Sequence, residues 1–394
     1  MKKHFLFVSV PASGHVNPTL ALVSELIDRG HAVSYAVGPD QADAVRATGA
    51  EVVELPTRMP DINPGAKLDP EHIRMMTEFF LTDVRQSMPI LLDRFAANPP
   101  DAVCFDMITL TGRMLGDKLG IPAIALTPSF ASNENFDLRQ RMMAAHTGQS
   151  GPTAEDLERI QAAVAELGQE FGVDVPAFVG GTPAELNLVF LPKEFQLEHE
   201  TFDERFHFIG PSLGDRENET YQPADQRRPL LFISLGTAFN DRPEFYRLCI
   251  EAFADTQWQV AMSVGNRIDI GALGEIPENF DVRTSFPQPA VLRHATAFIS
   301  HTGMNSTMES LYCGVPIVAV PQMAEQAANA ARAEELGVGI KLDPETVTTT
   351  ELRDAVDRMA IDQKVRANLT RLREAVIRAG GAPAGADALE AHLA

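Results

Sequence analysis

The sequence predicts an α/β protein with two doubly wound parallel-sheet domains, and two observations lead to this prediction. Over residues 4–55, apolar strands alternate with helical segments in the order strand, helix, strand, helix, strand, which is half of a doubly wound sheet. A second series of the same kind opens at residue 230, after the polar, proline-containing segment 210–229. We therefore expect two similar domains that face each other across a cleft.

The first series starts with the buried strand HFLFVSV, which runs into the turn PASGHVNP. Asn17 is expected to cap the next helix, with Pro18 at its first position and Gly30 just past its end. HAVSYAVG and EVVELP form the next two strands, on either side of the helix PDQADAVRATG. Longer helical segments at 60–100 and 131–180 interrupt this order, and between them DAVCFDM, LTGRMLGDKLG and IPAIALTPS restore strand, helix, strand.

The second series starts with PLLFISLGTAFN, a strand that runs into a glycine-containing turn. It continues as the helix PEFYRLCIEAFADT, the strands QWQVAMSVG and NFDVRTSF, the helix PAVLRHA, the strand AFISHTG, a helix from about Asn305, the strand VPIVAVP and the helix EQAANAARAEELG. The expected organisation is a first domain at 1–212, a linker at 213–229, a second domain at 230–375 and a C-terminal helix at 376–394 that packs back on the first domain.

The charge and the cysteines of the chain limit which partners and which cellular compartment we expect. The formal net charge is −21, and no cluster of Lys and Arg is longer than a pair, so nucleic acid is not an expected partner. The three cysteines lie far apart in apolar runs, which is typical of reduced thiols. The N-terminal apolar run ends at Pro11, too early for an export signal or a membrane span. A cytoplasmic protein without a membrane span is expected.

Several common binding signatures are missing from the sequence. G-x-G-x-x-G follows neither opening strand and G-x-x-x-x-G-K-[ST] does not occur, which argues against a dehydrogenase-type dinucleotide site and against a P-loop. No set of His, Cys and carboxylate residues has the spacing of a structural metal site. The remaining candidates are polar residues at the carboxyl ends of the predicted strands, where ligands of such sheets bind.

His15 and Asp106 stand at the carboxyl edge of the same predicted sheet. His15 follows the first strand, and Asp106 closes the strand AVCFD. Taken singly, the His side chain fits a bond to neighbouring backbone, and the Asp side chain fits a helix cap or a turn. Together they can form a general base and the carboxylate that orients it. A nucleophilic Ser is not evident, since no G-x-S-x-G surrounds Ser13.

The segment HTGMNSTMES indicates a diphosphate site at a helix N-terminus. Gly303 lets the backbone approach a ligand, and His301 adds a hydrogen-bond donor. The helix is expected to start at about Asn305 or Ser306, so that its free N–H groups and its dipole face the phosphates. The S-x-x-E spacing of Ser306 and Glu309 also fits a capping box, which is a purely structural alternative.

A second polar pair follows the next predicted strand, in the segment PQMAEQ. Glu325 and Gln326 offer the acceptors and donors that sugar hydroxyls require. The same two side chains fit the cap of the following helix equally well, so both interpretations stay open at this point.

Taken together, these segments resemble the family 1 glycosyltransferases of GT-B fold, in the UDP-glycosyltransferase superfamily, and particularly the bacterial macrolide-type glycosyltransferases. The resemblance runs from residue 1 to about 380 and is most specific over 285–326. There the pattern P-Q-x-x-x-L…H-x-G-x-x-S-x-x-E…G-V-P…P-Q-x-x-[DE]-Q is written by Pro287, Gln288, Leu292, His301, Gly303, Ser306, Glu309, Gly314, Pro316, Pro321, Gln322, Glu325 and Gln326. GHVNP in the first turn matches the acceptor-side signature of the family.

The resemblance implies two Rossmann-like domains and an inverting, metal-independent O-glycosyltransferase. The first domain would bind the acceptor, a lipophilic hydroxylated natural product such as a macrolide or a flavonoid. The second would bind the nucleotide-sugar, which is a co-substrate rather than a cofactor; UDP-glucose or a related donor is expected, with UDP favoured over dTDP. A bacterial role in antibiotic biosynthesis or resistance fits this chemistry. Monomer and dimer both stay open.

The resemblance also implies roles for single residues. His15 would deprotonate the acceptor hydroxyl, with Asp106 hydrogen-bonded behind it. The diphosphate would be held at the helix start and by the SLGT turn, where a helix N-terminus and a His replace the charge of a Mg²⁺ ion. The residues expected around the diphosphate are Thr237, His301, Gly303, Asn305 and Ser306.

The remaining expected contacts lie on the nucleoside and the sugar. Glu309 would bind the ribose hydroxyls, Gln288 lies in the segment expected near the base, and Glu325 and Gln326 lie near the sugar. Two positions depart from the family pattern. The aromatic residue usual two places before P-Q is Ser285 here, with Phe286 displaced by one, and the usual Asp is Glu325.

The sequence gives a weaker signal for the acceptor site, and two other functions are compatible with the fold. Met59 to Met88 and Phe130 to Met143 are rich in Met and Phe and would line a tolerant pocket, although most of these side chains fit helix core faces better. The alternatives are a nucleotide-sugar epimerase of the same fold and a catalytically silent GT-B partner protein. An epimerase needs carboxylates around the sugar carbon, and a silent partner has no need for a base.

Overall fold

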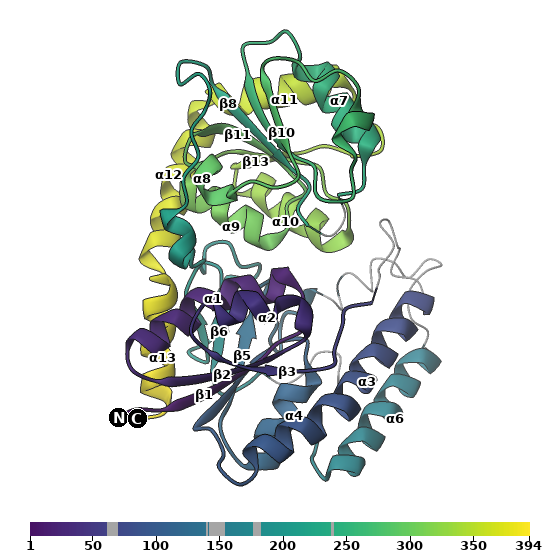
Figure 1. Ribbon diagram of the computed structural model, residues 1–394, viewed down its shortest axis with the longest axis vertical. Coiled ribbons are helices and arrows are strands. Elements are labelled where there is room, and N and C mark those ends of the chain that lie inside the picture. The colour runs from purple at the N-terminus through teal and green to yellow at the C-terminus, as the bar shows by residue number, and fades with distance from the viewer. Residues whose placement is uncertain (61–69, 139–140, 142–153, 176–182, 238–239) are drawn as a thin grey trace. The chain divides into compact units, whose positions relative to one another are not determined.

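The chain forms two compact α/β units, each built on one parallel sheet. The structure is a computed structural model, and it describes residues 1–60, 70–138, 141, 154–175, 183–237 and 240–394. One unit is Met1–Gly214 together with Ala379–Ala394, and the other is Asp215–Arg378. The predicted class, two doubly wound parallel sheets with helices, is confirmed (Figure 1). Among the described residues, no helix has the length and apolar composition needed to cross a membrane.

The first unit has a seven-stranded sheet with the order β3-β2-β1-β4-β5-β6-β7. Its strands are β1 His4–Val8, β2 Ala32–Val37, β3 Glu51–Glu54, β4 Ala102–Asp106, β5 Ala123–Thr127, β6 Asn187–Val189 and β7 Phe206–Phe208. Its helices are α1 Ser13–Asp28, α2 Pro39–Arg46, α3 Pro70–Phe95, α4 Leu110–Leu119, α6 Ala154–Phe171 and α13 Gly381–His392. Every strand pairing in this sheet is parallel.

Alternate side chains of β1 enter two separate cores, which explains why the strand is apolar throughout. Phe5 and Phe7 pack in a cluster with residues of α1 and α13 on one face of the sheet. Leu6 and Val8 pack on the other face with residues of α3, α4 and α6. Figure 1 shows the two helical layers on opposite sides of this sheet.

The second unit has a six-stranded sheet with the order β10-β9-β8-β11-β12-β13, also parallel throughout. Its strands are β8 Leu230–Ser234, β9 Gln259–Ser263, β10 Phe280–Arg283, β11 Ala295–Ser300, β12 Ile317–Ala319 and β13 Gly339–Lys341. Its α-helices are α7 Pro243–Phe253, α8 Gln288–Leu292, α9 Met304–Cys313, α10 Ala324–Glu335, α11 Thr349–Ile361 and α12 Gln363–Arg378.

The C-terminal helix α13 belongs to the first unit and packs along α1. Leu389 is fully buried in the core that also holds Leu22. Gly385 lies so close to Leu22 that an added Cβ would come within 3.1 Å of that side chain. Arg29, just past the end of α1, pairs with Asp387 at 2.6 Å and Glu390 at 3.0 Å. Close packing and ion pairs therefore tether the last residues of the chain to its first helix.

α1 starts earlier than its proline indicates, so the prediction of Asn17 as N-cap was wrong. The helix begins at Ser13, and Pro18 lies inside it rather than at its first position. The N–H of Val16 already donates to a carbonyl four residues earlier, at 3.0 Å, so one turn is closed before the proline. Pro18 removes one intrahelical bond, and the burial of this residue offsets that loss. His15 consequently lies within the first turn of a helix.

Candidate active site

Four of the predicted site residues follow the central strands of the two sheets. In each unit the opening strand, β1 or β8, has neighbours on both sides, and the connections leave it in opposite directions. Ligands of doubly wound sheets bind at such a switch point, outside the carboxyl ends of the strands. His15 follows β1 and Asp106 ends the adjacent β4, while Thr237 follows β8 and His301 follows the adjacent β11.

The structure brings His15 and Asp106 together. Register places Val8 at the end of β1 beside Phe105 of β4, so the next residues of both strands reach the same edge. His15 Nδ1 lies 2.7 Å from Asp106 Oδ2, and the backbone N–H of Ile108 donates to Asp106 Oδ1 at 3.0 Å. The Asp106 side chain is 2% exposed and that of His15 is 26% exposed.

This geometry suits a general base with its orienting carboxylate. Asp106 is buried and held on both oxygens, so its carboxylate fixes the imidazole plane and favours the tautomer with the proton on Nδ1. Nε2 of His15 then remains as the basic nitrogen. When it takes a proton, the adjacent carboxylate stabilises the resulting imidazolium. The pair can therefore remove a proton from a hydroxyl group placed next to it.

His301 is buried at the start of the turn before α9, and its expected role beside the diphosphate stays a prediction. Burial lowers the pKa of His301 to about 4, and a hydrogen bond to the Ser234 backbone opposes the shift only in part. The ring fits tightly between two glycines, because a Cβ added to Gly236 or to Gly303 would come within 2.5 Å of its Nε2. The lowered pKa favours the neutral imidazole near pH 7, and the dipole of α9 adds positive potential at the same place.

Thr302, between His301 and Gly303, holds the turn before α9 in an uncommon conformation. Its φ of 61° lies in the left-handed region, which is unfavourable for a β-branched residue. Four described contacts hold it. Thr302 N donates to Ser300 Oγ at 3.0 Å, and the Thr302 carbonyl accepts from Asn329 at 2.9 Å. Thr302 Oγ1 lies 2.6 Å from the His301 carbonyl and 2.9 Å from the Gln326 carbonyl. Sequence reasoning missed both Thr302 and Asn329.

The capping-box alternative for Ser306 and Glu309 is wrong. α9 starts at Met304 with Gly303 at the N-cap, so Ser306 lies within the first turn and cannot cap it. Its Oγ instead accepts a hydrogen bond from Gln288 Nε2 at 3.0 Å. Asn305 lies in the same turn and is half-buried. The N–H groups of this turn, which have no intrahelical partner, are the ones available to an anion.

Glu309, Gln288 and Ser306 form one hydrogen-bonded cluster. Gln288 Nε2 donates to Glu309 Oε2 at 2.7 Å as well as to Ser306. The other carboxylate oxygen, Glu309 Oε1, lies 2.7 Å from Nη1 of Arg216. Sequence reasoning missed Arg216, which lies in the segment expected to be a linker. A single Arg in a polar segment does not indicate which helix its side chain will contact.

Phe286 packs into the protein, and Ser285 before it is exposed. The Phe286 ring makes edge contacts with Tyr221 and Phe232, at centroid distances of 5.7 and 6.0 Å. The Arg283 guanidinium lies 4.8 Å from the centre of the same ring. The predicted contact of Phe286 with a base stays a prediction.

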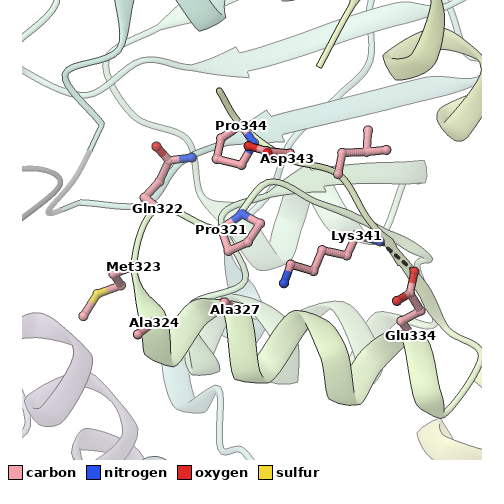
Figure 2. A pocket seen from close by; sticks show the side chains of 10 residues that line it. Pro321, Gln322, Met323, Ala324, Ala327, Glu334, Lys341, Asp343 and Pro344 are labelled. Carbon is pink, nitrogen blue, oxygen red and sulfur yellow. Dashed lines mark hydrogen bonds between the residues drawn. The ribbon is translucent and has the colours of Figure 1, made fainter. Parts of the chain in front are cut away.

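Gln326 serves partly as a structural residue, as its alternative interpretation proposed. It is buried in the first turn of α10, and its Oε1 accepts from the backbone N–H of Gln322 at 2.8 Å. Glu325 beside it is half-buried. Gln322 Oε1 in turn accepts from Arg242 Nη1 at 2.7 Å, which ties this segment to the loop after β8. Figure 2 shows the hollow that adjoins the segment, between Gln322, Met323 and Lys341.

The aromatic and Met-rich segments of the first unit are partly core where the structure describes them, and Met59, Met75, Met76 and Phe79 are half-buried. Met88 of α3 is fully buried, and Phe130 and Phe136 are nearly so. Phe130 stacks on Phe195 at a centroid distance of 5.7 Å. For Met88, Phe130 and Phe136 these positions support the core interpretation over a pocket lining. Within these two segments, residues 61–69, 139–140 and 142–143 lie outside the described residues.

Comparisons with known proteins place the chain in a family. Residues 250–386 match the model of the erythromycin biosynthesis protein CIII-like C-terminal domain. The chain is 42% identical over 405 residues to the NDP-glycosyltransferase YjiC of Bacillus subtilis (strain 168), covering 100% of this chain and 98% of that protein. It is 37% identical over 402 residues to the demethyllactenocin mycarosyltransferase of Streptomyces fradiae, covering 99% and 86% of the two chains.

A solved structure agrees with these relatives. The calicheamicin glycosyltransferase CalG4 superposes with a TM-score of 0.88 at 36% identity, covering 100% of this chain and 98% of that one. Two parallel-sheet units with polar residues at both switch points thus define the GT-B class of glycosyltransferase. Within that class, the chain belongs to the macrolide-type family 1 glycosyltransferases, which confirms the resemblance found in the sequence.

Proposed function

We propose that this glycosyltransferase is an inverting O-glycosyltransferase that uses no metal ion and transfers a sugar from a nucleotide-sugar to a hydroxyl of a lipophilic natural product. The hydrogen bond of 2.7 Å between His15 and Asp106 is the observation that carries the proposal, because an acceptor hydroxyl requires a base. The names of the relatives support the acceptor class, since they refer to demethyllactenocin and calicheamicin. A macrolide or a flavonoid is the acceptor type that we expect.

In the proposed reaction, Nε2 of His15 takes the proton of the acceptor hydroxyl. The acceptor oxygen forms a bond to the anomeric carbon of the sugar, while the bond from that carbon to the diphosphate oxygen breaks and its electron pair leaves with the diphosphate. Attack from the face opposite the leaving group inverts the configuration. Asp106 stabilises the imidazolium that forms, as the orienting carboxylate does in other base–carboxylate pairs.

The leaving group is assigned to the first turn of α9. Its N–H groups and helix dipole favour a diphosphate, and neutral His301 with Thr237 adds donors. Glu309 is assigned to the ribose hydroxyls and Gln288 to the base side, with Glu325 and Gln326 near the sugar. UDP is expected over dTDP, and glucose is the expected sugar. The three free cysteines support a reducing, cytoplasmic location.

A donor-by-acceptor panel read by mass spectrometry tests the proposal. Purified protein is incubated with UDP- and dTDP-sugars and with macrolides and flavonoids, with and without EDTA. The expected result is a hexose mass increment on an acceptor, unchanged by the chelator. A new sugar isomer formed from the donor alone would instead indicate an epimerase. Nucleotide binding without transfer to any acceptor of the panel would indicate a silent partner protein.

A further inference from the structure

A short 3₁₀ helix at the start of the second unit, η2 Gly214–Asn218, is fixed to α9 by two side-chain contacts. Arg216 Nη1 lies 2.7 Å from Glu309 Oε1, and the Tyr312 hydroxyl donates to Glu217 Oε1 at 2.5 Å. Glu309 and Tyr312 are three residues apart on α9 and therefore lie on one face of the helix. Two contacts at neighbouring positions fix the direction from which Arg216 approaches the carboxylate.

The Glu309 carboxylate is buried and held by one donor on each oxygen. Its side chain is 6% exposed, whereas that of Arg216 is 37% exposed and reaches in from the surface. A buried carboxylate needs a counter-charge, and the Arg216 guanidinium supplies it. Gln288 Nε2 holds the second oxygen at 2.7 Å. The donors therefore come from two separate elements, η2 and α8, and restrict rotation of the carboxylate plane.

The arrangement leaves a defined capacity for further hydrogen bonds. Each carboxylate oxygen can accept about two hydrogen bonds. The described part of the chain supplies one to Oε1, from Arg216, and one to Oε2, from Gln288. One acceptor position per oxygen remains, which matches the two neighbouring hydroxyls of a ribose. A 2′-deoxyribose would leave one of these buried positions unpaired, and an unpaired buried acceptor is costly.

We propose that Arg216 is a positioning residue that sets the sugar specificity of the nucleotide site, so that the site selects ribonucleoside diphosphates over 2′-deoxyribonucleoside diphosphates. The inference rests on the proposed role of Glu309 in ribose binding and adds a determinant to it. With Arg216 present, both carboxylate oxygens face the two hydroxyls at once. Without Arg216, the Glu309 carboxylate rotates about its side-chain bonds and accepts hydrogen bonds from a single hydroxyl or from water. The 2′-hydroxyl then no longer contributes to the binding affinity.

Calorimetric titration with UDP and 2′-deoxy-UDP tests the inference, because the two nucleotides differ only in one hydroxyl. Wild-type protein is expected to prefer UDP by about tenfold or more. In Arg216→Gln the preference is expected to fall to about threefold or less, through weaker UDP binding with 2′-deoxy-UDP binding nearly unchanged. Arg227→Gln is the matched control, since Arg227 precedes the same unit's first strand, is 90% exposed and pairs with Asp225. It should keep the wild-type preference.

Two further variants keep the inference testable. Arg216→Lys retains the charge but not the planar fork of the guanidinium, and is expected to give an intermediate preference. If Arg216→Gln does not fold, the comparison of Arg216→Lys with wild type tests the inference. In Glu309→Gln, adding Arg216→Gln should change the preference no further, because both substitutions remove the same interaction. An Arg216 variant that loses equal affinity for both nucleotides, or none, overturns the inference. Wild-type protein that binds neither nucleotide overturns the proposed function, and the inference with it.

Discussion

At the scale of single residues, His15 and Asp106 are expected to act as a unit. Asp106→Asn should lower kcat by about 10²- to 10⁴-fold, because an amide cannot stabilise the imidazolium and favours the wrong tautomer. His15→Ala should lower kcat at least as much. Neither substitution touches the residues assigned to the nucleotide, so the Kd for UDP should change by less than about twofold. Initial rates and calorimetric titration measure the two quantities.

His207→Ala is a suitable control for the His15 variant, since His207 lies exposed on β7. It should have wild-type kinetics. A His15→Ala protein that keeps most of its turnover would remove this residue from the proposed mechanism.

The buried imidazole of His301 should make the protein less stable in acid. Its pKa is lowered to about 4 in the folded state, against an ordinary value of 6.5. Below pH 6.5 the unfolded chain binds a proton that the folded protein does not, so stability falls as the pH decreases from 6.5 towards 4. The loss attributable to this residue between near pH 7 and near pH 5 is about 2 kcal/mol.

Urea unfolding of wild type and His301→Gln at both pH values measures this contribution. The variant is expected to be less stable at neutral pH, because it loses a closely packed ring, but its stability should depend less on pH by about 2 kcal/mol. An identical pH dependence in the two proteins would show that the ring titrates normally in the folded state.

The residues found from the sequence share one property: each follows a strand or starts a helix in a motif of fixed spacing. His15, Asp106 and His301 could be placed in this way. Arg216 and Thr302 could not. The partner of Arg216 lies 93 positions away along the chain, and no local pattern encodes such a contact. The left-handed conformation of Thr302 opposes its own backbone preference and exists because the surrounding structure imposes it.

At the scale of elements, the turn between β11 and α9 depends on the absence of a side chain at Gly303. Its φ of −57° is ordinary, so alanine would not strain the backbone there. An alanine Cβ would nevertheless come within 2.5 Å of His301 Nε2, and the ring would have to move. Gly303→Ala should therefore weaken UDP binding by about tenfold or more and destabilise the protein by about 1–3 kcal/mol.

Thermal unfolding and calorimetric titration of Gly303→Ala measure these effects. Gly271→Ala is the comparison, because its added Cβ would approach nothing closer than 3.3 Å, at the carboxylate of Asp269. It should bind UDP as the wild type does. Unchanged binding in Gly303→Ala would show that the position of the His301 ring does not matter for the nucleotide.

The elements that escaped sequence reasoning are the short ones. β6, β7 and β13 have three residues each, too few to show a period. Tertiary pairing with longer neighbours creates these strands. The longer buried strands were identified because both of their faces are apolar, as in β4, whose first four residues are apolar and buried. The early start of α1 also follows from tertiary packing, since local rules place Pro18 near a helix start.

At the scale of the whole molecule, the division into two sheets was predictable because the chain repeats its opening pattern. The strand order of the second sheet reproduces that of the first six strands of the first sheet, with the opening strand third in each. This order puts the two groups of site residues at equivalent edges of their sheets. Sequence periodicity alone could not supply the contacts of η2 with α9, which depend on where the polar segment 210–229 crosses the surface of the second unit.

The last 16 residues should be required for the stability of the first unit, to which Ala379–Ala394 belongs. Truncation after Arg378 would remove the fully buried Leu389 and the ion pairs of Arg29, and would uncover part of α1, the helix that has His15 in its first turn. Each large apolar side chain lost from a core costs about 1.5–3 kcal/mol, and each partly exposed ion pair costs less than about 1 kcal/mol. The sum is comparable with the whole stability of an ordinary domain.

Differential scanning calorimetry of the truncated protein should therefore show a separate transition of the first unit at least about 10 °C lower than in the full chain. The truncated protein should also lose its transfer activity, because α1 positions the proposed base. The second unit has its own sheet and core, so UDP should still bind with nearly the wild-type Kd. Arg29→Gln in the full chain separates the loss of the ion pairs from the loss of packing. A small decrease in the transition temperature of this variant would assign most of the effect of truncation to packing along α1. A truncated chain that melts and turns over as the full chain does would show that α13 contributes nothing to the unit it packs on.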